Sequence, residues 1–448
     1  MDSHAATPAP GQHELVLNWL TEDRPEQLER LWHMADVTRA RFVGDAVELC
    51  GTIKISNHCG EACSYCGLQF RNRDLHRYRL TPAQILGCAR EAVQFGYRSV
   101  VLQAGLDGQL TAEWLGDIIR SLKKETGLAV GLSLGERSDE ELAAWRKAGA
   151  DRYYLRFLTA DTNLYRLLHA TASFGDQGRL PFLAKLKSLG YEVASGIIVG
   201  IPGQDVNGLA ADIERIRALD LDAVLIGPYV SASEWRAMPA SDAAYADVPP
   251  PALTALKAIA LVRLLCPEAD VPGTAALAAV GLADAPALAL QRGANMLFPE
   301  LTPRVCRTDY ACYPGRVPLD ELDYFNGRSS LRARLDELGR RPATEKRARR
   351  RSAAEASALS PAPRAEPELR VTVCMGSSCF SRGNNRTVTE IRDFIERHHL
   401  AGRAVLEGHL CTGMCKHGPN VGVGSETHSH ADAAAVIELL RHHFSLKE

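Results

Sequence analysis

The sequence predicts a parallel α/β barrel of the TIM type, (β/α)8, followed by a small α/β domain. Two observations predict the barrel. Runs rich in apolar and β-branched residues recur between residues 51 and 298, and amphipathic helical patterns lie between several of them. A third observation separates the two domains, because composition changes sharply after Asp336 into a basic and then an Ala/Ser/Pro-rich stretch.

The elements follow in chain order. Apolar residues recur at helical spacing from Leu15 to Arg41, which predicts an N-terminal helical cap. The predicted barrel strands share short length and high apolar content: 51–56, 99–103, 129–134, 152–155, 192–199, 223–227, 294–298 and a run at 269–273 that two prolines keep short. The helices predicted between them are 82–95, 112–125, 140–148, 180–189 and 208–219. Such alternation favours a closed parallel sheet.

Four segments result from this division. They are a helical cap (1–45), the barrel (46–336), a linker (337–367) and the C-terminal domain (368–448). The linker is interpreted as a solvated, flexible connection, and docking of an acidic partner is the alternative. Within the last domain, strands are predicted at 369–373 and 404–407 and helices at 388–398 and 431–444.

Charge and hydropathy exclude several classes of protein. The 52 basic and 54 acidic residues give a net charge of -2, so nothing indicates a nucleic-acid partner. No run of about 18 apolar residues predicts a membrane span. Residues 1–12 lack the apolar stretch of a secretory signal. A cytoplasmic protein without a membrane or nucleic-acid partner is expected.

The 12 cysteines indicate metal sites. A large chain without a signal does not need disulfides, and a reducing cytosol would not preserve them. The cysteines that group together form a tight triplet and, near the C-terminus, two close pairs: Cys59, Cys63, Cys66, Cys374, Cys379, Cys411 and Cys415.

The triplet follows the first predicted strand in a C-x3-C-x2-C pattern. Three thiolates can hold three corners of a 4Fe-4S cluster and leave the fourth iron open. Zinc is the rival, with His58 or His76 as the fourth ligand. A loop after a barrel strand is where TIM-type chemistry is placed. An open iron there could chelate S-adenosylmethionine (SAM), and one electron would then release a 5′-deoxyadenosyl radical.

With Tyr65 before its third cysteine, the triplet is the radical SAM signature, and the surrounding motifs resemble the HydE family of FeFe-hydrogenase maturases. That family is related to methylornithine synthase and, more remotely, to biotin synthase. The resemblance covers residues 15–320. The motifs that carry it are 56–59, 66–68, 77–82, 101–103, 133–136, 150–153, 200–204, 227–228, 292–295 and 313–315.

Several residues are predicted to bind SAM. Glu136, after the third strand, suits the ribose hydroxyls, because a carboxylate accepts from both; an exposed loop acid is the alternative. Arg156, after the fourth strand, suits the SAM carboxylate. The resemblance also places Arg179 near that carboxylate, against the alternative of a surface arginine. Tyr65 and Gln103 complete this part of the predicted cofactor site.

The Gly196-x-Ile198-x-Gly200 strand resembles the strand whose backbone pairs with adenine in radical SAM barrels. By itself such a pattern can mean only close packing. The resemblance further implies a substrate-binding role for Thr274 and Tyr310.

The chain departs from its relatives at four places. Where the family has two paired threonines, this chain has Thr274 followed by Ala275. Leu106 stands where many relatives have an acid that holds the SAM amino group, with Asp107 one place later, and Leu158 replaces a carboxylate of the maturase. Cys306 replaces a pocket tyrosine. Because Cys306 and Cys312 have no third partner before the linker, no second barrel cluster is expected.

The C-terminal pairs predict a 2Fe-2S cluster, with two thiolates on each iron. The pairs are Cys374-x4-Cys379 and Cys411-x3-Cys415. A zinc site is the rival, although zinc ribbons favour the C-x2-C spacing. The pattern resembles thioredoxin-like 2Fe-2S ferredoxins, which are also found as parts of NADH dehydrogenases and hydrogenases.

The resemblance implies a radical SAM enzyme that acts on a small molecule or small iron complex in assembly of the FeFe-hydrogenase active-site cofactor, the H-cluster. One alternative is a mutase or synthase on an amino acid, as in methylornithine formation. A non-catalytic iron–sulfur electron carrier is the other. The ferredoxin domain would reduce the SAM cluster or dock a hydrogenase-maturation protein or redox partner, and the sequence leaves that choice open.

Overall fold

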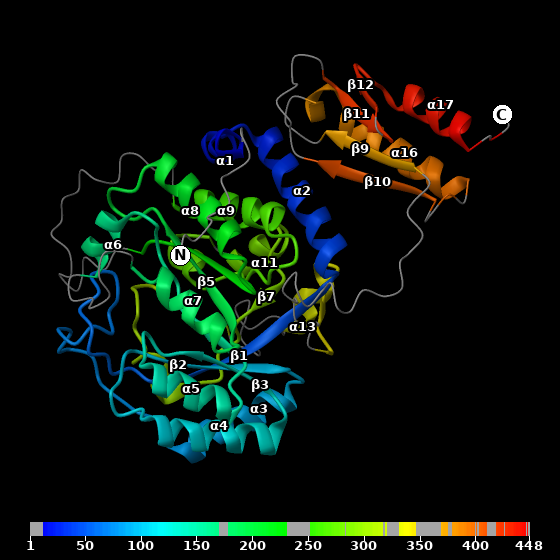
Figure 1. Cartoon of the computed structure of the whole chain (residues 1–448). Coiled ribbons are helices and arrows are strands. Elements are labelled where there is room, and N and C mark those ends of the chain that lie inside the picture. Colours follow the sequence, from blue (N-terminus) through cyan, green and yellow to red (C-terminus); the bar gives the residue numbers. More distant parts are fainter. Residues whose placement is uncertain are drawn as a thin grey trace. The chain divides into compact units, whose positions relative to one another are not determined.

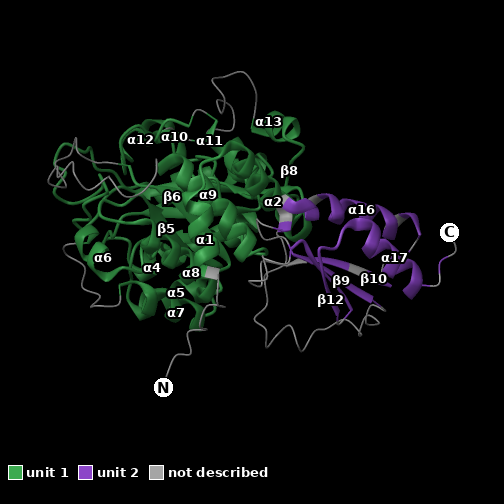
Figure 2. Cartoon of the chain, turned by 90° about the horizontal axis from the view of Figure 1, so that it is seen from above, with its two compact units in different colours: residues 1–8, 13–350 green, residues 9–12, 351–448 purple. Residues whose placement is uncertain are grey.

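The computed structural model has two compact units, residues 13–350 and residues 351–448 (Figure 2). The described residues are 12–169, 178–230, 251–282, 284–316, 319, 331–345, 369–374, 379–398, 400, 403–409, 418–424, 426–444 and 446. Each unit has its own hydrophobic core and its own sheet.

The first unit is built on a parallel sheet that curls around an interior (Figure 1). Its strands are β1 (Ala46–Ser56), β2 (Ser99–Ala104), β3 (Ala129–Ser133), β4 (Arg152–Tyr154), β5 (Glu192–Val199), β6 (Ala223–Pro228) and β7 (Met296–Leu297). They are hydrogen-bonded in the order β6-β5-β4-β3-β2-β1-β7, and β8 (Arg341–Pro342) pairs with the start of β1. The predicted linker therefore begins with residues that are bonded to the barrel.

The predicted run at 269–273 connects the two ends of this sheet. Asp270 bridges Ala223 of β6, and Pro272 bridges Met296 of β7. The Val224 amide donates to the Asp270 carbonyl at 2.8 Å. Proline has no amide hydrogen, which explains why this run makes isolated bridges rather than a regular ladder. The ring of hydrogen bonds closes through it, and the predicted barrel is confirmed.

Helices cover the outside of the barrel (Figure 1). The helices of this unit that follow β1 are α3 (Pro82–Gln94), α4 (Ala112–Thr126), α5 (Asp139–Ala148), α6 (Thr162–Leu168), α7 (Leu180–Ser188), α8 (Val206–Leu219), α9 (Pro251–Leu265), α10 (Ala276–Ala279), α11 (Ala285–Leu290), α12 (Arg304–Arg307) and α13 (Leu331–Glu337). Capping explains where two of them begin: Thr81 caps α3 and Ser138 caps α5, each in a capping box. Helical periodicity did not predict α9, because it is buried from Thr254 to Arg263 and presents no polar face there.

The predicted N-terminal helical segment is two helices, α1 (Gln12–Thr21) and α2 (Pro25–Val43). Pro25 stands at the first position of α2, where a missing amide hydrogen costs nothing. The buried Lys257 of α9 donates to the carbonyl of Leu20 at 2.9 Å, so this segment is fixed to the barrel.

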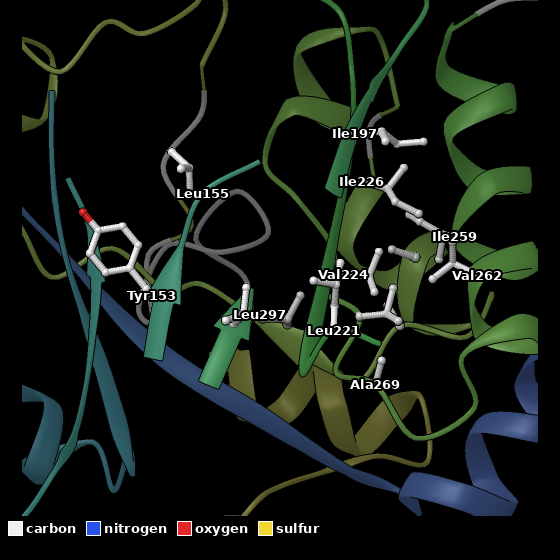
Figure 3. Packing of buried hydrophobic residues seen from close by; sticks show 14 of the residues in the cluster. Tyr153, Leu155, Ile197, Leu221, Val224, Ile226, Ile259, Val262, Ala269 and Leu297 are labelled. Carbon is white, nitrogen blue, oxygen red and sulfur yellow. The ribbon is translucent and has the colours of Figure 1, made fainter. Parts of the chain in front are cut away.

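The barrel core joins its sheet to its helices. Val224 and Ile226 of β6 point toward Ile259 and Val262 of α9 (Figure 3), and all four side chains are completely buried. Burying a side chain of this size stabilises a fold by about 1.5–3 kcal/mol. The rigid scaffold fixes where each strand ends, and therefore where the loops that follow the strands begin.

The second unit is a four-stranded sheet with helices. Its elements are β9 (Leu369–Cys374), α16 (Asn385–Arg397), β10 (Ala404–His409), β11 (Asn420–Val423), β12 (Glu426–Ser429) and α17 (Ala433–His443). The strand order is β10-β9-β11-β12, with β9 and β10 parallel and the other pairs antiparallel. The short hairpin β11–β12 was not predicted, because its residues include glycines and exposed polar residues. Among the described residues of both units, no helix is long and apolar enough to cross a membrane.

Candidate active site

A cavity of about 390 Å³ lies where the barrel strands end. Residues from the carboxyl ends of β2, β3 and β5, and from the loops after β1, β4 and β6, line it. This is the end of a parallel barrel at which catalytic groups are placed. The predicted site residues that line it are Cys59, Cys63, Tyr65, Cys66, Gln103, Glu136, Arg156, Arg179, Ile198, Thr274 and Tyr310. Gly196 and Gly200 are outside the lining.

The three cysteines of the first motif lie on one loop after β1. The Cys59 Sγ accepts hydrogen bonds from the amides of Glu61 at 3.5 Å and Leu106 at 3.4 Å. Gly105 permits this approach, because a Cβ there would lie 2.5 Å from the Cys59 Cβ. The loops after β1 and β2 are therefore joined at the sulfur of Cys59.

The thiols of this loop suit a bound iron–sulfur cluster. Burial raises the pKa of each of them, and that of Cys63 to about 12. Partly buried thiols of this kind ionise readily only when a cation compensates the thiolate charge. Amides that donate to a cluster sulfur also tune its potential. In the part of the chain that the structure describes, no three Cys, His, Asp or Glu side chains converge as ligands of a single metal ion.

Cys312 is a further thiol beside the loop. Its carbonyl accepts the Gly67 amide at 3.0 Å, and its charge is one of the causes that raise the pKa of Cys66, after burial. Its place beside the cysteine loop was not predicted. Its distance of 246 positions from Cys66 removed any local signal. Cys306 is half-buried and does not line the cavity.

Glu136 and Arg179 pair inside the cavity, Arg179 Nε donating to Glu136 Oε1. The side chain of Glu136 is 8% exposed and that of Arg179 is 12% exposed. The alternatives, an exposed loop acid and a surface arginine, are therefore wrong. Arg179 Nη1 also donates to the carbonyl of Arg156 at 2.9 Å. Within the described residues Glu136 Oε2 accepts no hydrogen bond, and it remains available to a ligand.

Arg156 presents a guanidinium to the cavity. Among the described residues no carboxylate pairs with it, and burial lowers its pKa because the charged form is poorly solvated. The guanidinium lies against Gly227, where a Cβ would be in ordinary contact with its nitrogens at 3.7 Å. A partly buried cation of this kind is suited to an anionic ligand group.

The glycines of the predicted adenine strand have packing roles in the structure. A Cβ at Gly196 would lie 2.0 Å from the Leu225 carbonyl oxygen, so glycine lets β5 and β6 approach closely. The Gly200 amide donates to Gln204 Oε1 at 2.8 Å. Ile198, between the two glycines, is the residue of this motif that lines the cavity.

Asp107, which follows Leu106, is hydrogen-bonded to residues other than a ligand. The buried Asp107 accepts hydrogen bonds from Arg79 Nε at 2.7 Å and Nη2 at 3.0 Å, and from Ser56 Oγ at 2.7 Å. Leu106 and Leu158 present apolar side chains to the cavity instead. The cavity wall is therefore apolar at both of these positions.

The predicted substrate residues Thr274 and Tyr310 also line the cavity. The Thr274 hydroxyl donates to the Ile226 carbonyl at 3.1 Å. The buried Tyr310 ring lies 5.0 Å from the Lys54 Nζ. Lys54 and Arg316 both pair with Glu300. This group was not predicted, because Lys54 is more than two hundred positions from Glu300, and because Glu300 and Arg316 lie beyond the last predicted strand.

His169 is another cavity residue without a sequence signal. Its Nε2 lies 3.3 Å from the Tyr65 hydroxyl, and burial lowers its pKa to about 3, so the ring is neutral. Its Nδ1 and the Tyr165 hydroxyl are buried without a hydrogen-bond partner among the described residues. The Tyr65 hydroxyl therefore contacts the neutral ring of His169.

In the second unit, Cys374 and Cys379 are buried free thiols at the end of β9. Asn420 Nδ2 donates to the Cys379 Sγ at 3.8 Å, and Asn384 Nδ2 donates to the Cys374 carbonyl at 2.8 Å. The predicted ligands Cys411 and Cys415 lie outside the described residues.

Sequence profiles assign a family to each unit. The radical SAM superfamily matches residues 53–216, and the thioredoxin-like 2Fe-2S ferredoxin family matches residues 361–443. The chain is 40% identical over 296 residues to the FeFe-hydrogenase maturase subunit HydE of Thermotoga maritima, covering 66% of this chain and 82% of that protein. It is 28% identical over 328 residues to the 3-methylornithine synthase of Methanosarcina barkeri, covering 73% and 89%.

Solved structures agree with the barrel. The crystal structure of methylornithine synthase (PylB) matches with a TM-score of 0.60 at 25% identity, over 74% of this chain and 97% of that one. The maturase HydG of Carboxydothermus hydrogenoformans matches with a TM-score of 0.59 at 18% identity, over 74% and 76%, which shows a common fold.

Proposed function

This chain belongs to the HydE family of FeFe-hydrogenase maturases, and on that premise we propose that its cavity binds SAM between the cysteine loop and Arg156. It is a radical SAM enzyme of the HydE type, acting in assembly of the H-cluster. Its cofactors are a 4Fe-4S cluster with SAM and, in the second unit, a 2Fe-2S cluster.

Cys59, Cys63 and Cys66 would hold the 4Fe-4S cluster, which supplies one electron that cleaves SAM and yields a 5′-deoxyadenosyl radical. The protein then has to bind and orient SAM. Arg156 would bind the methionyl carboxylate, and Glu136 Oε2 the ribose hydroxyls. Arg179 holds Glu136 in place, so the acid is oriented before SAM arrives.

One observation carries this proposal. The guanidinium of Arg156 lines the same cavity as the three thiols, and no carboxylate of the described residues pairs with it. A partly buried cation without a carboxylate is stabilised when an anionic ligand group compensates its charge. Tyr65, Gln103 and Ile198 complete the proposed cofactor wall, with Ile198 against the adenine. A small molecule or small iron complex would lie deeper, near Thr274 and Tyr310.

The test is SAM cleavage by the whole chain after anaerobic reconstitution. With dithionite and SAM, the wild type should form 5′-deoxyadenosine, and Arg156→Met should bind SAM about tenfold or more weakly while its iron content is unchanged. Arg166→Met, an exposed arginine on α6, is the matched control. A fully loaded wild type that forms no 5′-deoxyadenosine would refute the enzyme and leave an electron carrier.

The substrate has a second candidate, because the match to 3-methylornithine synthase covers most of that enzyme. Two assays separate the candidates. The HydE function predicts that the chain replaces HydE in a reconstituted maturation of apo-hydrogenase with the companion maturation proteins. Conversion of an amino acid by the chain alone, without an effect on hydrogenase, would favour the alternative.

The ferredoxin unit is proposed to deliver the electron, and the protein to work in the cytoplasm. A tethered donor is present at high effective concentration. Cys379→Ala should keep cleavage driven by dithionite but lose cleavage driven by NADPH with a ferredoxin reductase. Cleavage that persists under the reductase would exclude the donor role and favour docking of a redox partner or maturation protein.

A further inference from the structure

Asp212 on α8 is a buried carboxylate outside the cavity that the proposed chemistry does not use. Its side chain is 1% exposed. Oδ1 accepts from the Ala160 amide at 2.6 Å and the Thr159 hydroxyl at 3.2 Å, and Oδ2 accepts from Gln204 Nε2 at 3.0 Å. No cation among the described residues pairs with it, so the carboxylate is held by hydrogen bonds alone.

Gln204 links Asp212 to the end of β5 through hydrogen bonds. Its Oε1 accepts the Gly200 amide at 2.8 Å and the Ile201 amide at 3.4 Å, and its Nε2 also contacts the Ile198 carbonyl at 3.4 Å. Gln204 is 2% exposed, so no water competes for these groups. The orientation of its amide is set by Asp212, because a carboxylate can only accept.

Both segments held in this way continue into the cavity wall. Thr159 follows Leu158, and Gly200 is two residues beyond Ile198, while Leu158 and Ile198 both line the cavity. Leu158 and β5 are bonded to each other, since the Leu158 amide donates to the Gly196 carbonyl at 3.0 Å and the Ile198 amide to the Leu158 carbonyl at 3.0 Å. One carboxylate therefore joins α8 to the loop after β4 and, by way of Gln204, to the end of β5.

We propose that Asp212 is a positioning residue for SAM, which through Gln204 fixes the Leu158–Ile198 wall of the cavity against which the adenine binds. This inference rests on the proposed function, because it needs SAM at that wall. Asp212 touches neither SAM nor the cluster. It acts by dictating which end of the Gln204 amide faces Gly200.

The hydrogen-bond pattern predicts what each substitution does. In Asp212→Asn the carbonyl stays with Ala160 and Thr159, so the new amide nitrogen faces Gln204 Nε2, donor against donor. Gln204 must turn over, and its nitrogen then opposes the Gly200 amide. In Gln204→Glu two carboxylates face each other, which is also unfavourable. In the double variant, the introduced asparagine donates to the introduced glutamate, and that glutamate accepts the Gly200 amide, so the connection from residue 212 to Gly200 is restored. Only the 3.4 Å contact that Gln204 Nε2 makes with the Ile198 carbonyl is not replaced.

The experiment measures SAM affinity of the full reconstituted chain, with iron counted on every sample. D212N and Q204E should each bind SAM about tenfold more weakly at unchanged iron content, and D212N/Q204E should return to within about threefold of the wild type. A merely structural loss would make the double variant worse than either single one. If D212N does not fold, the SAM affinities of Q204E and D212N/Q204E are compared instead, and a higher affinity of the double variant supports the inference.

Two results would overturn the inference: SAM affinity of D212N equal to the wild type, or no recovery in D212N/Q204E. Both leave the proposed function intact, because the wild type still binds SAM. A wild type that binds no SAM at full iron content would instead refute the proposed function, and this inference with it.

Discussion

The carboxylate of Glu136 pairs with the guanidinium of Arg179 inside the barrel cavity, although the two residues lie 43 positions apart on different loops. Arg179 also donates to the carbonyl of Arg156 at 2.9 Å. The three residues that the sequence singled out separately for SAM therefore form one connected group. The pair fixes one oxygen of Glu136 and leaves the other for a ligand.

Substitution of Glu136 by glutamine should weaken SAM binding by about tenfold to a hundredfold. The change removes an acceptor for the ribose and leaves the Arg179 cation without its carboxylate. Equilibrium binding of SAM to the reconstituted protein measures this effect. Glu140→Gln, at an exposed position of α5, is the control and should bind normally. Equal affinity in both variants would remove Glu136 from the SAM site.

Cys63→Ala should abolish 5′-deoxyadenosine formation and lower iron and sulfide by about four atoms each per chain. Two thiols cannot hold three corners of the cluster. Cys312→Ala should keep the iron content, because Cys312 lies outside the motif although it is close to Cys66. Iron and sulfide counts with the spectrum of the reduced cluster provide the measurement. Loss of the cluster from Cys312→Ala would mean four protein ligands, with no iron left open for SAM.

SAM affinity should fall as the pH is lowered through about 6. Burial, together with the negative charge of Asp161, raises the pKa of Asp212 to about 6 against the effect of the hydrogen bonds that it accepts. Above this pH Asp212 is ionised and orients Gln204; below it the protonated oxygen no longer accepts from Gln204 Nε2. A raised pKa also means that protonation favours the folded state, so acid does not unfold the chain through this group.

The ratio of SAM dissociation constants between D212N and the wild type isolates this titration, since groups shared by both proteins cancel. The ratio should be about ten at pH 7.5 and approach about one near pH 5. A ratio that is the same at both pH values would exclude Asp212 as the titrating group.

The barrel and the cysteine loop were predictable because their signals are local. Buried parallel strands are short apolar runs, and the run at 192–199 matches β5 from its first to its last residue. The C-x3-C-x2-C spacing lies within eight residues. For the same reason the predicted strand positions placed Glu136 and Arg156 at one end of the barrel.

Interactions between distant residues had no such signal. Periodicity does not reveal that Asp107 is used by Arg79, or that Gln204 takes the Gly200 amide. A glycine motif has the same sequence pattern whether its glycines make room for a ligand or for a neighbouring strand. The Lys54–Glu300 pair spans 246 positions, so only the closed barrel brings its members together.

Asn420→Leu should lower the reduction potential of the 2Fe-2S cluster by tens of millivolts. Asn420 Nδ2 donates to the Cys379 Sγ at 3.8 Å, and a donor to a cluster sulfur stabilises the more negative, reduced state. A net hydrogen bond of about 1 kcal/mol corresponds to roughly 40 mV for one electron. The measurement is a redox titration followed by the spectrum of the reduced cluster in the full chain. Thr427→Val, at an exposed position on β12, is the control; an equal potential in both variants would show that Asn420 does not tune the cluster.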